Sequence, residues 1–215
     1  RRIVIIPNIS TYYRHRMQNY PAYAEIIQRV TAINPGNYLV FFPSFEFLQH
    51  TRIFLGNLAS DLLWQRQQMT ESDRVEIMQH LREGGKPKTL LAVMGGIFSE
   101  GIDLSGDTCI GVIVFSPALP KITFERELLR QYYDSQDQDG FQEAYVYPGI
   151  NKVIQAVGRL IRSERDRGII VLAGERFAED RLNQLLPSHW FERPGDVVIA
   201  DAYEDPIREF WAGIK

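Results

Sequence analysis

Short continuous apolar runs alternate with amphipathic stretches along this chain, and this alternation limits the fold more than any other feature. A strand covered by helices on both faces reads as such a run, because neither face meets water. The sequence therefore predicts one α/β domain of three layers, with a mostly parallel central sheet flanked by helices. The runs of strand length are residues 2–7, 38–42, 89–94, 110–115, 169–172 and 197–200.

Helix-like segments fill the intervals between these runs. Ser10 or Thr11 is expected to cap the first helix, which Pro21 is expected to break. Ser44 follows the second run and is placed to cap the next helix. The helical segments are expected at residues 10–30, 45–55, 72–82, 124–133, 150–163, 179–186 and 206–211.

Composition narrows the class of protein. The chain has 215 residues, a net charge of −3 and one cysteine, Cys109, so an internal disulfide and an all-cysteine metal site are excluded. No apolar run is long enough to span a bilayer and no signal peptide is evident, so we expect no membrane partner. The predicted location is the cytoplasm of a bacterium, or the nucleus if the source is eukaryotic, and we prefer the cytoplasm.

Residues 155–162 form the segment that carries the most chemistry. On a helix, the apolar residues around Val153 and Val157 face one side, while Gln155, Arg159 and Arg162 face the other. A guanidinium is always charged and its planar fork suits phosphate. One amide and two arginines on one face indicate a phosphate-binding helix, although a surface helix with two unremarkable arginines has the same pattern.

A second candidate is the loop at residues 95–104, which follows the third run. Gly95, Gly96 and Gly101 permit close approach of a ligand to the backbone, and Glu100 and Asp103 supply acceptors for a ribose hydroxyl or a water. A solvent loop with turn glycines is the alternative interpretation.

Together the two segments resemble motifs V and VI of the superfamily-two helicases, and the fit is best to the XPD/DinG family. The family's Ser-Glu-Gly-Ile-Asp loop matches residues 99–103, its Gln-Ala-x-Gly-Arg-x-x-Arg helix matches 155–162, and its motif IV is similar to 37–44. The resemblance covers residues 8–186. It implies a single RecA-like domain over 1–215, the C-terminal motor domain, with 1–186 as family core and 187–215 as an extension packed on it.

The resemblance also implies roles for individual residues. Arg162 takes the arginine-finger position with Arg159 beside it, and Gln155 positions the attacking water or the phosphate. The nucleotide is approached by Glu100, Gly101 and Asp103. Ser44 and Ser99 are assigned to the phosphate backbone of single-stranded DNA.

Some motifs that a complete helicase motor needs are not found in this sequence. No G-x-x-x-x-G-K-[ST] loop occurs, and Gly85-Lys86 is followed by proline. ATP and Mg²⁺ are therefore expected to be shared with an N-terminal RecA-like domain of the same parent, and any iron–sulfur cluster is expected in that missing half. The resulting hypothesis is part of an ATP-dependent 5′–3′ DNA helicase of DNA repair, inactive as an ATPase alone. The alternative is a non-catalytic module that binds DNA or a protein partner; a nuclease is disfavoured because no carboxylates cluster.

Other residues receive ordinary interpretations. The four histidines are scattered and predict no metal site. Tyr12, Tyr13, Tyr20 and Tyr23 could stack on bases, but their helical spacing favours a place in the core. Cys109 begins an apolar run and is expected to be inert.

Overall fold

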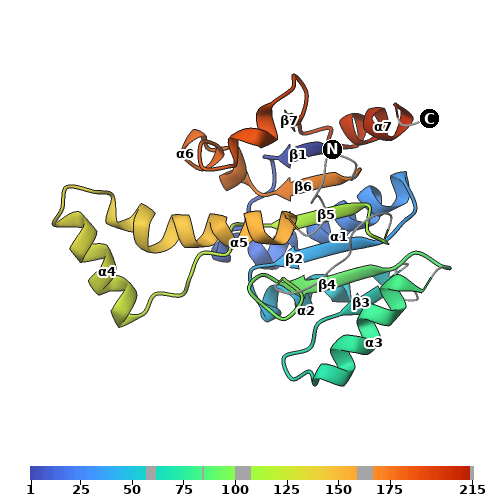
Figure 1. Ribbon diagram of the computed structural model, residues 1–215, viewed down its shortest axis with the longest axis horizontal. Helices are drawn as coiled ribbons and strands as arrows, with labels where there is room; N and C mark the ends of the chain where they lie inside the picture. Colours follow the sequence, from blue (N-terminus) through green and yellow to red (C-terminus); the bar gives the residue numbers. More distant parts are fainter. Residues whose placement is uncertain (57–61, 84, 100–107, 159–166, 214–215) are drawn as a thin grey trace.

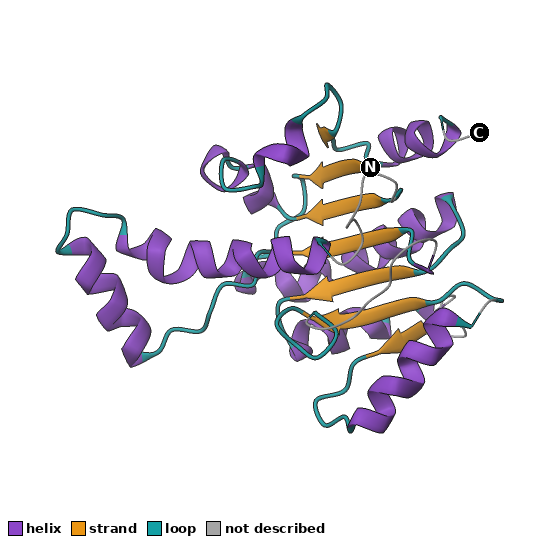
Figure 2. Ribbon diagram, in the orientation of Figure 1, coloured by secondary structure: helices purple, strands orange, loops and turns teal. Residues whose placement is uncertain are grey.

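The protein's fold is described from a computed structural model, which covers residues 1–56, 62–83, 85–99, 108–158 and 167–213. Within these ranges a single sheet has the strand order β3-β4-β2-β5-β6-β1-β7, and every described strand pair is parallel (Figure 2). The predicted parallel α/β sheet is therefore confirmed. Its strands are β1 (Arg2–Ile6), β2 (Tyr38–Phe42), β3 (Leu62–Trp64), β4 (Thr89–Val93), β5 (Gly111–Phe115), β6 (Ile169–Ala173) and β7 (Val197–Ile199).

Helices cover both faces of the sheet and form a three-layer structure (Figure 1). One face packs against α1 (Arg16–Ile33), α2 (Phe45–Ile53) and α7 (Glu204–Ala212). The other packs against α3 (Glu71–Arg82), α5 (Tyr147–Val157) and α6 (Asp180–Asn183). All five residues of β2, β4, β5 and β6 are buried, which explains their continuous apolar sequence.

The first helix differs from its prediction. It begins at Arg16 after a short 3₁₀ turn, neither Ser10 nor Thr11 caps it, and it continues through Pro21 to Ile33. Pro21 lies in the second turn, where its ring costs one backbone hydrogen bond. Burial of Tyr23, Ile27 and Val30 against the sheet outweighs that cost, because each is fully buried.

Two other elements depart from expectation. The short edge strand β3 was not predicted, and α5 begins at Tyr147, earlier than expected, after a π-helical stretch at Gln142–Val146. The helix α4 (Phe124–Asp134) confirms its prediction but buries none of its side chains and lies beyond the carboxyl edge of the sheet (Figure 1). Of the helices that the structure describes, none has an apolar stretch of the length that a bilayer crossing requires.

Candidate nucleic-acid and nucleotide interface

The candidate site lies at the carboxyl edge of the sheet, where the loops leaving parallel strands meet. Backbone hydrogen bonds join neighbouring loops just beyond the strands. Met94 N donates to Phe42 O at 2.9 Å, and Gly174 N donates to Ile6 O at 3.0 Å. The first of these bonds brings the loop that starts at Gly95 next to the turn that carries Ser44. Two segments singled out from the sequence are thus neighbours in space.

Ser44 is the N-cap of α2, as predicted. Its backbone is extended, and its Oγ accepts a hydrogen bond from Phe47 N at 3.2 Å. This bond leaves the hydroxyl proton of Ser44 available to an outside acceptor, and the side chain is partly exposed. The remaining amides of the first helical turn add partial positive charge at the same point.

A compact turn follows β4. Gly95 has φ of +73°, a conformation that favours glycine. Gly96 N donates to Val93 O at 3.0 Å, and Ser99 donates to Gly96 O both from its backbone nitrogen, at 2.9 Å, and from its hydroxyl, at 2.8 Å. Ser99 is buried, so its hydroxyl holds the turn together. Its assignment to DNA stays a prediction.

Gln65 supports this turn, and sequence analysis missed it. The side chain is 5% exposed, and its Oε1 accepts a hydrogen bond from Val93 N at 2.9 Å. A Cβ built on Gly96 would lie 2.6 Å from Gln65 Nε2, so the amide fills the space beside that glycine. A single glutamine in a polar loop gives no signal of such a role, because its partner is 28 residues away.

The helix α5 presents Gln155 as the sequence predicts. Val153, Ala156 and Val157 are buried against the sheet, whereas Gln155 is exposed. The apolar stripe therefore fixes the orientation of the amide. The other predicted site residues lie outside the described part of the chain: Glu100, Gly101, Asp103, Arg159 and Arg162.

The structure divides the four tyrosines into two pairs. Tyr20 and Tyr23 belong to the core, as predicted, and Tyr23 OH donates to Ser10 O at 2.6 Å. The expected core position is wrong for Tyr13, which is 75% exposed, and the guanidinium of Arg176 lies 4.1 Å from the ring centroid of the partly buried Tyr12. These two rings lie in the loop after β1, at the same edge of the sheet as Ser44.

Basic side chains accompany this pair of rings. Arg14 also lies against Tyr12, with its guanidinium 5.8 Å from the centroid, and Arg16 lies 5.0 Å from the ring of Phe47 in the first turn of α2. The exposed ring of Tyr13 lies 5.7 Å from the guanidinium of Arg16, and an aromatic ring flanked by arginine suits an unpaired base and its phosphate. The contact between Arg16 and Phe47 connects this cluster with the turn at Ser44.

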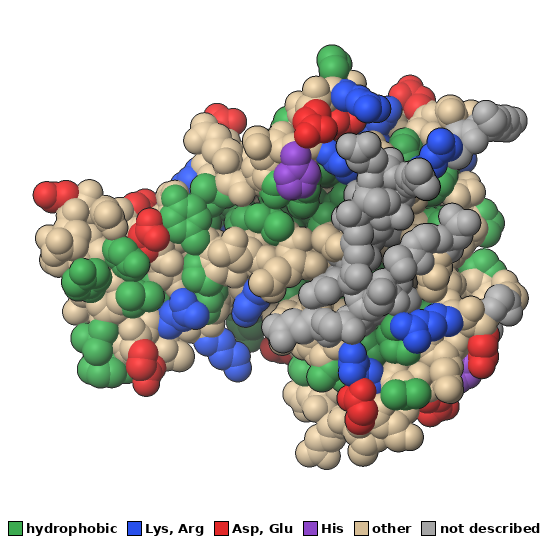
Figure 3. Space-filling model, viewed as in Figure 1, with side chains coloured by type: hydrophobic (Ala, Val, Ile, Leu, Met, Phe, Trp, Pro, Cys, Tyr) green, Lys and Arg blue, Asp and Glu red, His purple; other side chains and the backbone are tan. Residues whose placement is uncertain are grey.

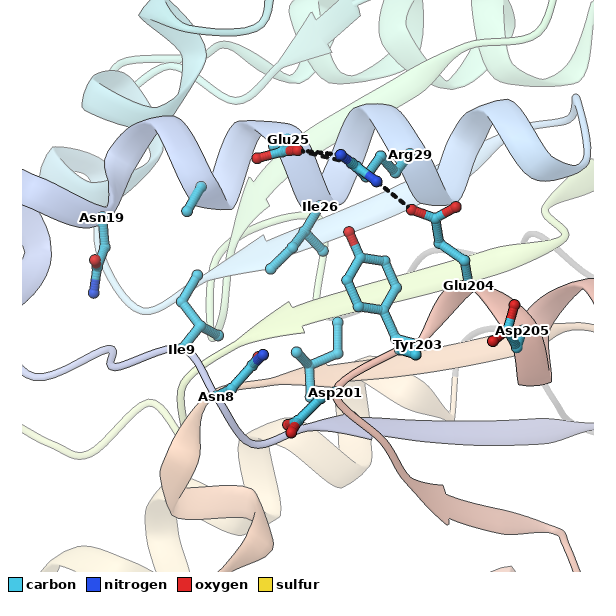
Figure 4. Close-up of a pocket in the computed structure, with 13 residues that line it drawn as sticks. Asn8, Ile9, Asn19, Glu25, Ile26, Arg29, Asp201, Tyr203, Glu204 and Asp205 are labelled. Carbon is cyan, nitrogen blue, oxygen red and sulfur yellow. Dashed lines mark hydrogen bonds and ion pairs between the residues drawn. The ribbon is translucent and has the colours of Figure 1, made fainter.

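A separate cavity of about 530 Å³ lies between α1 and the segment that joins β7 to α7 (Figure 4). Arg29 lines this cavity and forms ion pairs with Glu25 at 2.6 Å and with Glu204 at 2.7 Å. Burial raises the pKa of Tyr203 to about 12, so its hydroxyl stays protonated near neutral pH. Of the motif residues that the structure describes, Ser44, Ser99 and Gln155 do not line this cavity.

Metal-binding side chains do not gather anywhere in the described ranges: no group of three histidine, cysteine, aspartate or glutamate residues there could hold an ion. Cys109 is fully buried, and its thiol donates to Gly111 O at 3.3 Å. Burial raises the pKa of this thiol to about 12.

Comparisons with known proteins agree with this geometry. Residues 27–193 match the family model described as a helicase C-terminal domain. The chain is 33% identical over 153 residues to the ATP-dependent DNA helicase DinG of Photobacterium profundum, covering 69% of this chain and 22% of that protein. It is 26% identical over 201 residues to a probable ATP-dependent helicase of Methanocaldococcus jannaschii, covering 83% and 29%.

A solved structure of an XPD helicase superposes with a TM-score of 0.71 at 18% identity, over 93% of this chain and 35% of that one, which supports the RecA-like fold. The chain spans less than a third of the length of these two curated relatives. From the family match, which covers more than half of its residues, the chain belongs to the helicase C-terminal domain family, of the XPD/DinG type.

Proposed function

We propose that this chain is the second motor domain of an ATP-dependent DNA helicase that moves 5′ to 3′ on single-stranded DNA. The observation that carries the proposal is the arrangement of α5, which packs Val153 and Val157 on the sheet and leaves Gln155 exposed. In the sequence, the helicase motif that begins at Gln155 includes Arg159 and Arg162. The family membership supports a motor role, and the polarity rests on resemblance to the family.

In this proposal the nucleotide is bound between this domain and an N-terminal RecA-like domain. Arg162 stabilises the charge that develops on the transferred phosphoryl group, an effect on the order of 10³–10⁵ in rate, and Arg159 assists it. Gln155 orients the attacking water or the phosphate. Glu100, Gly101 and Asp103 contact the nucleotide.

ATP and Mg²⁺ fit the described residues only in part. The exposed amide of Gln155 can donate to a phosphate oxygen, but the described residues include no cluster that could hold the metal. ATP and Mg²⁺ are shared with the N-terminal domain in this proposal, and that domain also holds the phosphate-binding loop and any iron–sulfur cluster. The isolated chain should hydrolyse ATP negligibly.

Single-stranded DNA is placed on the carboxyl edge. Ser44 and Ser99 are the predicted backbone contacts, and the rings of Tyr12 and Tyr13 provide stacking surfaces for bases beside them. None of these groups reads a particular base edge, so binding is expected to tolerate any sequence.

Steady-state ATPase measurements test the motor proposal. The 215-residue chain is compared with the chain rejoined to its N-terminal half, with and without single-stranded DNA. We expect negligible turnover for the chain alone, and DNA-stimulated turnover for the rejoined protein that falls at least a hundredfold in Arg162→Ala. If DNA does not stimulate ATP turnover of the rejoined protein, or if Arg162→Ala does not lower it, the motor proposal is wrong. The chain is then better explained as a non-catalytic module that binds DNA or a protein.

A further inference from the structure

Lys152 lies where the two motif segments meet, although it belongs to neither motif. It is on α5, one turn before Gln155, and its side chain is partly buried. A Cβ built on Gly95 would lie 3.5 Å from Lys152 Cε and 3.7 Å from Nζ. The lysine therefore reaches from the helix to the first glycine of the loop after β4.

Among the residues that the structure describes, the ammonium group of Lys152 has no acidic partner. None of the ion pairs of the described residues includes it, and it is not among the residues with further interactions. Several other basic side chains of the described ranges do form ion pairs, for example Arg29, Arg130 and Arg181. A lysine held partly out of water without a counter-ion is a ready partner for an anion.

Gly95 supplies a second donor at the same place. Its backbone N–H makes no hydrogen bond in the described part of the chain, whereas the neighbouring amides of Met94 and Gly96 are both used. Gly95 is exposed and its φ is +73°, a backbone conformation that favours a residue without a side chain. An ammonium group and an amide that makes no hydrogen bond among the described residues are donors that suit a phosphate oxygen.

The position along the sheet favours a phosphate of the DNA strand over one of the nucleotide. Met94 N bonds to Phe42 O, two residues before Ser44, so Lys152 and Ser44 border the same edge. We propose that Lys152 and the Gly95 amide bind a phosphodiester group of single-stranded DNA. This inference rests on the proposed function and adds a cationic contact to the two serine contacts predicted from the motifs.

The experiment measures binding of a fluorescein-labelled oligo(dT) to the 215-residue chain by fluorescence anisotropy over a series of salt concentrations. Lys152→Met keeps most of the apolar stem and removes the charge. We expect it to weaken binding roughly tenfold at low salt, the loss of one charge-assisted contact. The slope of log K against log salt should become shallower by about 0.7, the value for one phosphate contact on a single strand. Lys152→Arg should retain both quantities within about twofold.

Lys88→Met is the matched control. Lys88 precedes β4 at the opposite edge of the sheet, is partly buried as Lys152 is, and loses the same charge. Its salt slope should equal that of the wild type. An oligo(dT) with an uncharged methylphosphonate backbone should bind the wild type and Lys152→Met equally weakly.

Three outcomes separate the hypotheses. If Lys152→Met binds oligo(dT) as the wild type does while Ser44→Ala weakens it, this inference is wrong and the proposed DNA surface stands. If the loss appears with a fluorescent ATP analogue and not with DNA, the phosphate belongs to the nucleotide and the assignment to the strand is overturned. If the wild type does not bind oligo(dT) at low salt, the DNA surface and this inference fail together.

Discussion

Gln65 offers the sharpest test of how the candidate site is built. The edge strand β3 pairs with β4 only as far as Trp64 and Leu91, and Gln65 N then bonds to Leu91 O at 2.8 Å. Beyond that point the side chain replaces the missing strand, because Gln65 Oε1 accepts from Val93 N. The amide of glutamine thus extends the ladder by one bond, directly before the turn at Gly95.

The expected cost follows from these contacts. Gln65→Leu keeps the apolar stem but leaves Val93 N–H without its acceptor, which should lower the free energy of unfolding by about 1–3 kcal/mol. Gln65→Ala also loses the buried Cγ methylene, or roughly 0.8 kcal/mol more. For a domain of this size each kcal/mol lowers Tm by about 2–4 °C. Gln65→Ala should therefore melt about 4–15 °C below the wild type.

Thermal and urea denaturation measure both variants, and Gln67→Ala is the control because Gln67 is exposed in the same loop. The control should lie within about 0.5 kcal/mol of the wild type. If Gln65→Leu is as stable as the control, the side chain does not complete the ladder and the reasoning is refuted.

Two further predictions concern elements away from the site. Thr70 caps α3: its Oγ1 accepts a hydrogen bond from Asp73 N at 3.2 Å, and Asp73 Oδ2 accepts one from Thr70 N at 2.8 Å. Thr70→Ala should therefore lower the free energy of unfolding, measured by urea denaturation, by about 1 kcal/mol. Ser72→Ala, on the exposed first turn, is its control, and equal stability of the two variants would contradict the capping role. Cys109 should not react with a thiol reagent at pH 8 in the folded protein, because burial raises its pKa to about 12, and should react fully in urea. Rapid labelling of the native chain would show that the thiol is accessible.

The sequence predicted the sheet well because its strands are buried on both sides. Five runs of apolar residues became β1, β2, β4, β5 and β6, since little except a covered strand has that pattern at that length. The edge strand β7 was also predicted, from residues 197–200, whereas β3 at the other edge was missed because its three apolar residues make too short a run. Local pattern also failed at Pro21, where tertiary burial of the same helix overrides a local penalty.

Residues of the candidate site could be predicted only where a sequence motif or a helical periodicity indicated them. Ser44 and Gln155 were found because a cap and an amphipathic helix have fixed spacings. Gln65 and Lys152 were not assigned roles, because each acts on a glycine turn distant in sequence, and only the order of the strands brings them there. The exposure of Tyr13 likewise could not be predicted, because it depends on the path of the loop after β1.

The packing of α5 limits how strand binding and nucleotide hydrolysis can be coupled in the proposed motor. Lys152 and Gln155 are three residues apart, about 4.5 Å along the axis of one helix. The same helix is packed against the sheet by Val153, Ala156 and Val157, which are 0%, 0% and 2% exposed. A close-packed interface of this kind does not deform gradually. We therefore expect the two side chains to move together, so that coupling arises from movement of the whole domain against its partner and not from a change within α5.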